Sequence, residues 1–154
     1  MQLSQKETSL LKDLKEQEQV CIEKYNKYSS EASDAQLKNL FGKLAQAEQT
    51  HLDTVNQIMS GTVPSVQSGG SSNQMQNNFT PTYNSADSST NKQKDCFLCT
   101  DLLSTEKYVA SAYNTSIFEF GDTNIRNALN HIQKEEQQHG EQIYNYMSQN
   151  GMYN

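Results

Sequence analysis

The sequence lacks several features that would place it in common functional classes. No apolar run approaches the roughly 18 residues that cross a bilayer, and residues 1–17 are charged without the long apolar core of a secretory signal. No block of basic residues occurs, and the formal net charge is −6, which argues against a nucleic-acid partner. We therefore expect synthesis in the cytoplasm and neither membrane nor nucleic acid as a partner.

Cysteine is also scarce, with only three residues in the chain. Cys96 and Cys99 form one CxxC pair, which is half of a four-thiolate metal site, and Cys21 stands alone. Three cysteines are too few for a disulfide framework. A structural or incidental role and a redox or intermolecular disulfide remain open for the pair.

Proline occurs only twice, and both residues fall in one segment that divides the chain. Residues 62–91 contain Pro64 and Pro81, a single charge and many Ser, Asn and Gln residues. Such a composition buries too little apolar surface to offset its ordering entropy. We predict a first helical hairpin over residues 1–61, a long crossover linker over 62–91 that is flexible or draped over the surface, and a second hairpin over 92–154, together forming one domain.

Outside that linker the apolar residues recur at three- and four-residue steps, which is typical of helices with one buried face. No segment alternates with a period of two, so no sheet is expected. Ser33-Asp34 and Gly121-Asp122 have the chemistry of turns and helix N-caps, and Gly61 and Gly151 follow helical patterns as C-terminal glycines do. The sequence predicts an all-α, four-helix bundle made of two antiparallel hairpins.

The two hairpins are repeats of each other. A shift of 88 residues aligns 14–60 with 102–148 without a gap and matches 12 identical residues in 47 positions. The expected turns and caps coincide under the same shift. We interpret the chain as a duplicated hairpin.

Six ionisable residues interrupt the apolar stripes and therefore face the predicted core. They are Glu18, Glu48, His51, Glu106, Glu136 and His139. Buried carboxylates are costly unless they are neutralised. In the first hairpin Glu18 and Glu48 are equally far from the turn, and in the second hairpin Glu106 and Glu136 are. Antiparallel packing therefore brings the two glutamates of each hairpin to the same level along the bundle axis.

This set, one Glu from each of two helices and Glu-x-x-His from each of the other two, is the ligand set of two-metal carboxylate bundles. Four carboxylates balance two divalent ions, and carboxylate with imidazole suits iron, manganese or zinc. The sequence thus predicts a site for two divalent ions. A hydrogen-bonded polar layer that binds no metal is the alternative.

Other polar residues near the stripes have simpler interpretations. Tyr25 and Tyr113 follow Glu18 and Glu106 by seven residues on the same face. They could hydrogen-bond a ligand carboxylate, take part in redox chemistry or act as core aromatics. Glu135, next to Glu136, is expected to face solvent, and His131 is expected on the surface.

The second half also resembles a known family. TEKYVASAYNTSIFE at 105–119 and IQKEEQQHGEQIYNYM at 132–147 resemble the spore coat protein F (Coat F) family of endospore-forming bacteria. The resemblance implies a ferritin-like bundle and a role in the spore coat, with other coat proteins or self-association as partners. It implies no catalytic activity.

The six ionisable residues as a set resemble the sites of rubrerythrin and manganese catalase. That likeness implies that all six are ligands and that Glu48 and Glu136 bridge the ions. Rubrerythrin's four-cysteine iron site is missing. Three functions follow as hypotheses: a structural coat protein, a di-iron or di-manganese oxidoreductase acting on peroxide or dioxygen, and a metal-binding module without turnover.

Overall fold

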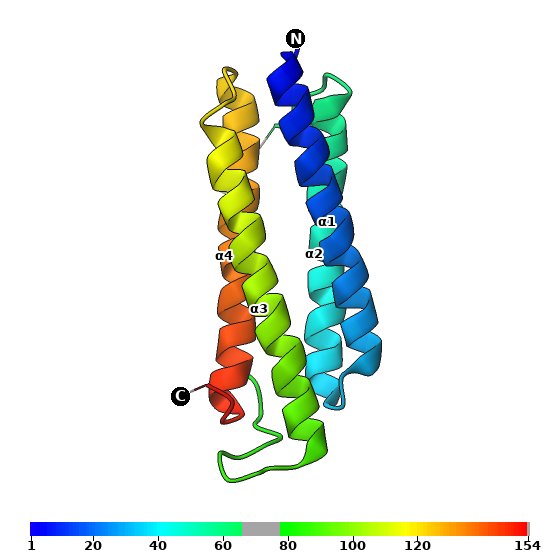
Figure 1. The fold of residues 1–154 in the computed structure, drawn as a ribbon, viewed down its shortest axis with the longest axis vertical. Helices are drawn as coiled ribbons and strands as arrows, with labels where there is room; N and C mark the ends of the chain where they lie inside the picture. The colour runs from blue at the N-terminus through cyan, green and yellow to red at the C-terminus, as the bar shows by residue number, and fades with distance from the viewer. Residues whose placement is uncertain (66–77, 154) are drawn as a thin grey trace.

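The computed structural model describes residues 1–65 and 78–153 and contains four long helices. They are α1 (Gln5–Glu31), α2 (Ala35–Met59), α3 (Thr90–Ile117) and α4 (Thr123–Gln149). No strand occurs in these two ranges. The prediction of an all-α, four-helix bundle built from two hairpins is confirmed (Figure 1).

Each hairpin consists of two antiparallel helices that pack closely, α1 with α2 and α3 with α4. α2 ends at the end of the bundle where the N-terminus lies, whereas α3 begins at the opposite end (Figure 1). The end of α2 and the start of α3 therefore lie at opposite ends of the bundle, and α2 and α3 run in the same direction. The middle of the predicted linker, residues 66–77, lies outside the described residues.

The helix ends follow the expected capping chemistry. Asp34 caps α2 by accepting a hydrogen bond from the backbone N–H of Gln36, and Asp122 caps α4 by accepting from Asn124 and Ile125. Gly61 and Gly151 follow α2 and α4 with positive φ angles of 91° and 64°. These left-handed conformations favour glycine.

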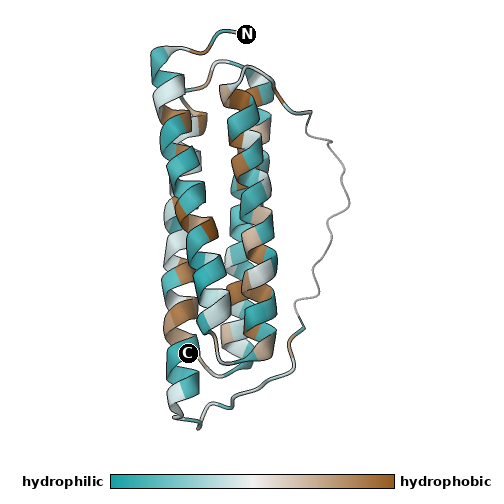
Figure 2. Cartoon of the chain, turned by 90° about the vertical axis from the view of Figure 1, so that its right-hand side faces the viewer, coloured by the Kyte–Doolittle hydropathy of each residue, from teal (hydrophilic) through white to brown (hydrophobic). Residues whose placement is uncertain are grey.

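The core consists of two apolar clusters separated along the bundle axis by a polar layer. Leu37, Phe41 and Leu44 of α2 belong to one cluster, and Val55 and Ile58 of the same helix belong to the other. The buried polar residues Glu48 and His51 lie between them. Outward-facing positions are mainly hydrophilic (Figure 2), and no helix among the described residues is long and apolar enough to cross a membrane.

Residues 78–89 pack against the end of the bundle that holds the α1–α2 turn. The backbone N–H groups of Thr82 and Tyr83 donate to Oδ1 of Asn150, at 2.8 and 3.1 Å. The Tyr83 hydroxyl donates to the buried carboxylate of Asp95 at 2.8 Å. The composition of the linker does not specify these particular contacts. α3 begins at Thr90, two residues before the predicted start of the second hairpin at residue 92.

Candidate metal centre

The six side chains predicted to line the core converge at the middle of the bundle, and none of the six residues is more than 4% exposed. They form two overlapping groups in which one ligand atom per residue lies within 4.8 Å of every other. The first group is Glu18, Glu48, His51 and Glu136, and the second is Glu48, Glu106, Glu136 and His139. Each of the four helices contributes to the centre the residues that interrupt its apolar stripe in the sequence.

Glu48 and Glu136 belong to both groups and connect the two histidines. The two oxygens of Glu48 lie 2.8 Å from Nδ1 of His139 and 3.2 Å from Nδ1 of His51. The two oxygens of Glu136 lie 2.7 Å from Nδ1 of His51 and 3.7 Å from Nδ1 of His139. Each carboxylate therefore spans the centre, which is the position that a bridging ligand needs.

Glu18 and Glu106 lie on the outer sides of the centre and are held by tyrosines. Tyr113 of α3 donates to Glu18 of α1 at 2.5 Å, and Tyr25 of α1 donates to Glu106 of α3. Each tyrosine thus bonds the carboxylate of the opposite hairpin. One oxygen of each carboxylate is fixed by its tyrosine, and the remaining oxygen, Oε2, has no hydrogen-bond partner.

The buried charges shift the protonation equilibria of these groups. Burial and the neighbouring Glu48 raise the pKa of Glu18 well above its ordinary value. At both imidazoles burial lowers the pKa, but the surrounding carboxylates outweigh burial, and the pKa of His51 and of His139 lies well above the ordinary value. These directions favour the protonated forms of Glu18 and of both imidazoles.

Four buried polar atoms in the described residues have no hydrogen-bond partner, and all belong to the centre. They are Oε2 of Glu18, Nε2 of His51, Oε2 of Glu106 and Oε2 of Glu136. Because buried polar groups in native proteins almost always have partners, such a concentration calls for an explanation. Three are carboxylate oxygens, whereas Nε2 of His51 lies 3.5 Å from Glu135. Carboxylate oxygens together with the Nδ1 atoms of the two histidines, which face Glu48 and Glu136, are a donor set for iron, manganese or zinc. The residues therefore fit a metal ion.

Glu135 lies at the edge of the centre, and its contact with a ligand histidine is one that the sequence did not reveal; the side chain is only partly exposed to solvent, where the sequence predicted that it faces solvent. Its side chain is 33% exposed, and Oε1 lies 3.5 Å from Nε2 of His51 and 2.8 Å from Nε2 of His131. His131 itself is exposed, as predicted. The position that corresponds to Glu135 in the first hairpin is Ala47, so the repeat gave no signal for this contact.

The cysteines do not contribute to the centre. Within the described residues no disulfide forms and no cysteine belongs to a metal-binding group. Cys21 is buried on α1 between Glu18 and Tyr25, and burial together with the nearby carboxylates raises the pKa of its thiol. Cys99 is buried and Cys96 half-buried near the start of α3.

Comparison with known proteins gives one match. Residues 94–154 match the family model of the Coat F domain, which confirms the resemblance found in the sequence and suggests a protein of the spore coat. No curated protein and no solved structure matches the chain. The matched part contains Glu106, Glu136 and His139, so half of the centre lies in the Coat F domain and half outside it.

Proposed function

We propose that this chain, whose residues 94–154 form a Coat F domain, is a spore coat protein that holds two divalent metal ions inside a four-helix bundle. The observation that supports the proposal is the sharing of Glu48 and Glu136 by two ligand groups. One ion would lie among Glu18, His51 and the shared pair. The other would lie among Glu106, His139 and the same pair.

The charges support two ions rather than one. The centre has four glutamates that contribute −4 when ionised, and two divalent ions contribute +4. Ions also engage the carboxylate oxygens that otherwise have no partner. Unpaired buried charge costs several kcal/mol per group, so a metal-free protein must retain protons in the centre. Filling the site with metal removes that requirement.

Metal analysis of protein purified without chelators tests this proposal. After reconstitution with Fe(II) or Mn(II) we expect about two ions per chain, the stoichiometry of two-metal carboxylate bundles. Glu48→Ala and His51→Ala should lose most of the metal. Glu141→Ala on α4 and Glu23→Ala on α1 are matched controls because both side chains are exposed, and they should bind as much metal as the unmodified chain.

Two results would contradict the proposal. Binding of less than about 0.1 ion per chain after reconstitution would reject a metal site. Equal metal loss in the control variants would show that the ions bind at the surface. In either case the centre would be a polar layer held by hydrogen bonds.

The coat role makes a separate prediction about location. A fluorescent fusion of the chain should assemble on the coat of the forming spore, and the fusion with Glu48→Ala separates assembly from metal binding. Other coat proteins or further copies of this chain are the partners that we propose. Uniform fluorescence in the mother cell throughout sporulation would contradict a coat role.

A second candidate function is an oxidoreductase that acts on peroxide or dioxygen. Its support is the pair of buried phenols, Tyr25 and Tyr113, hydrogen-bonded directly to Glu106 and Glu18. Redox-active metal ions bound here would supply electron exchange and polarise the substrate. The phenols hold the outer carboxylates and keep a proton at the edge of the centre.

Peroxide consumption by the metal-loaded protein tests this second function. Turnover should require metal, and Tyr113→Phe and Tyr25→Phe should lower kcat while both ions remain bound. Tyr144→Phe is the control because Tyr144 is exposed on α4 and has no contact with either ligand group in the described structure. Metal binding without turnover would leave a coat protein that stores or is stabilised by metal.

A further inference from the structure

A groove of about 510 Å³ follows one half of the seam between α1 and α3. Polar and apolar side chains both line it. Its lining includes Asp13, Leu14 and Glu16 of α1 and Ala112 and Ser116 of α3, and no lysine, arginine or histidine is among the lining residues.

The corresponding half of the same seam is closed. Nζ of Lys24 on α1 donates to Asp101 and to Thr105 on α3, each at 3.1 Å. The hydroxyl of Tyr28 donates to the same Asp101 oxygen at 2.8 Å. These long side chains lie across the seam and join the two helices.

The 88-residue repeat relates the two halves residue by residue. Asp13 corresponds to Asp101, but the counterparts of Lys24 and Tyr28 are Ala112 and Ser116. The acid is present in both halves, whereas the side chains that cover it exist in only one. The groove is open because α3 has small residues where α1 has a lysine and a tyrosine.

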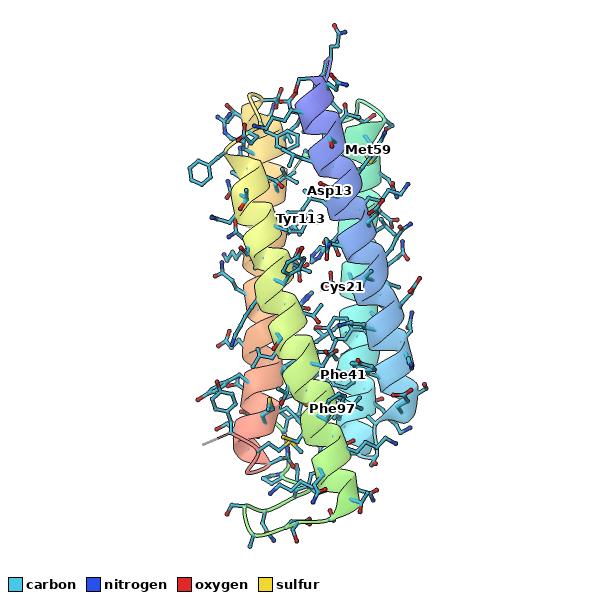
Figure 3. All side chains as sticks on the ribbon, in the orientation of Figure 1. Asp13, Cys21, Phe41, Met59, Phe97 and Tyr113 are labelled. Carbon is cyan, nitrogen blue, oxygen red and sulfur yellow. The ribbon has the colours of Figure 1, made fainter. Side chains whose placement is uncertain are left out.

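The inner end of the groove lies beside the metal centre. Leu14 precedes Glu18 by one turn on the same face of α1, and Ala112 precedes Tyr113, whose hydroxyl donates to Glu18. Asp13 and Tyr113 occupy the upper part of the α1–α3 seam and Cys21 lies near mid-height (Figure 3). Glu18 itself is fully buried and does not line the groove, and its Oε2 has no hydrogen-bond partner.

The charges of the groove suit a cation. Asp13 and Glu16 are exposed on its α1 side, and no positive side chain among the lining residues neutralises them. Two acids in a depression attract divalent cations and raise their local concentration. Beyond them the next carboxylate on α1 that faces the core is Glu18, which belongs to the centre.

We propose that the α1–α3 groove is the route by which divalent cations reach the centre, with Asp13 and Glu16 attracting the hydrated ion and Glu18 receiving it. This inference rests on the proposed two-metal function. The duplicated bundle has one access route instead of two because Lys24 and Tyr28 close the equivalent half.

Stopped-flow measurement of Mn(II) or Fe(II) uptake tests the route. The double variant Ala112→Lys/Ser116→Tyr introduces into the open half the lysine and tyrosine that cover the closed half. Their acceptors are available, since Asp13 and Gln17 occupy the positions of Asp101 and Thr105. We expect uptake at least about tenfold slower, because the variant adds bulk and a positive charge at the mouth. The final metal content should not change.

A second experiment opens the closed half of the α1–α3 seam. Lys24→Ala/Tyr28→Ser removes the cover from the closed half and should not slow uptake. Combined with Ala112→Lys/Ser116→Tyr, it should restore the rate through the newly opened half. Circular dichroism on each variant checks that the helices are retained.

Asp13→Asn/Glu16→Gln tests the charges without adding bulk, so it remains informative if the larger variant does not fold. Uptake should slow and lose much of its dependence on ionic strength. Unchanged uptake rates in both this variant and the closed variant would overturn the inference and direct attention to the α2–α4 side near Glu135. Absence of metal in the unmodified chain would instead refute the proposed function.

Discussion

Glu7 and Asp95 lie 88 residues apart, and each accepts a hydrogen bond from the turn of the opposite hairpin. Oδ1 of Asp95 accepts from the backbone N–H of Ser33 at 2.8 Å, and Oε1 of Glu7 accepts from that of Gly121 at 3.1 Å. Ser33 and Gly121 are themselves 88 residues apart. The duplication therefore includes the contacts that fasten one hairpin to the other.

The two contacts should differ in strength. Asp95 is fully buried and also accepts from Asp34 N–H and the Tyr83 hydroxyl. Asp95→Ala leaves three donors without their acceptor and should lower the free energy of unfolding by about 2–4 kcal/mol. Glu7→Ala removes a more exposed contact and should cost about 1 kcal/mol or less.

Urea unfolding of the metal-free protein, followed by circular dichroism, measures both changes. Equal losses in the two variants would show that burial does not distinguish the contacts. A loss below about 1 kcal/mol for Asp95→Ala would mean that water replaces the carboxylate.

Tyr25 and Tyr113 should contribute equally to the metal-free centre because they occupy equivalent positions. Tyr25→Phe and Tyr113→Phe each remove one hydrogen bond to a buried carboxylate. Leaving a buried polar group without its hydrogen-bond partner costs about 1–3 kcal/mol, and we expect a loss of that size in each variant. Tyr144→Phe, on the exposed surface, should change stability by less than about 0.5 kcal/mol. An effect confined to one of the two buried tyrosines would contradict the two-fold arrangement.

Glu135 should make the two metal positions unequal. Its carboxylate lies beside Nε2 of His51 and can fix the orientation and tautomer of that ring, whereas Ala47 offers His139 no such group. Loss of an outer partner of a ligating histidine typically lowers metal affinity about 10–100-fold. Glu135→Gln should therefore weaken one of two binding steps in a calorimetric titration.

The matched variant is Ala47→Glu, which places a carboxylate at the equivalent position of the first hairpin and should strengthen the other step. Equal weakening of both steps by Glu135→Gln would indicate a general structural effect. No change in either step would show that Glu135 plays no part in metal binding.

Metal binding should become stronger, and the metal-free protein less stable, as pH rises. The pKa of His51 and of His139 is raised in the folded metal-free protein. Protonated imidazoles then contribute stability that is full below their unfolded pKa of about 6.5 and disappears as pH rises through the higher folded value. Metal ions need neutral imidazole, so affinity increases over the same range.

Melting temperatures of metal-free and metal-loaded protein between pH 6 and pH 9 check this prediction. The Tm of the metal-free protein should fall with pH, and the difference between the two forms should widen. A constant difference across this range would mean that the histidines release no protons when metal binds.

The helices and the convergence of the centre could be predicted from the sequence because both depend on periodicity. Apolar residues at helical spacing define the buried stripes, and Glu18 and Glu48 fall in those stripes at equal distances from the turn at Ser33. The 88-residue repeat carries the same geometry to the second hairpin. Asp34 and Asp122 could be identified as caps from local chemistry alone.

The remaining features depend on contacts between side chains that no period specifies. Glu135 reaches His51 across the bundle, and Ala47 breaks the repeat at that position. The packing of Tyr83 against Asp95 joins a polar segment to a helix that follows it, and composition predicts only that the segment is not helical. The groove beside Ala112 exists because α3 lacks the long side chains that α1 has at the equivalent positions. This absence is recognised only when the open half of the seam is compared with the closed half.

The most direct test of the two-metal centre is anomalous diffraction from crystals grown with Mn(II) or Fe(II). We predict two anomalous peaks per chain, roughly 3.5–4 Å apart as in two-metal sites, between the carboxylates of Glu48 and Glu136 and beside Nδ1 of His51 and His139. A centre without anomalous peaks, in which Nδ1 of each histidine still bonds a carboxylate oxygen directly, would contradict the account.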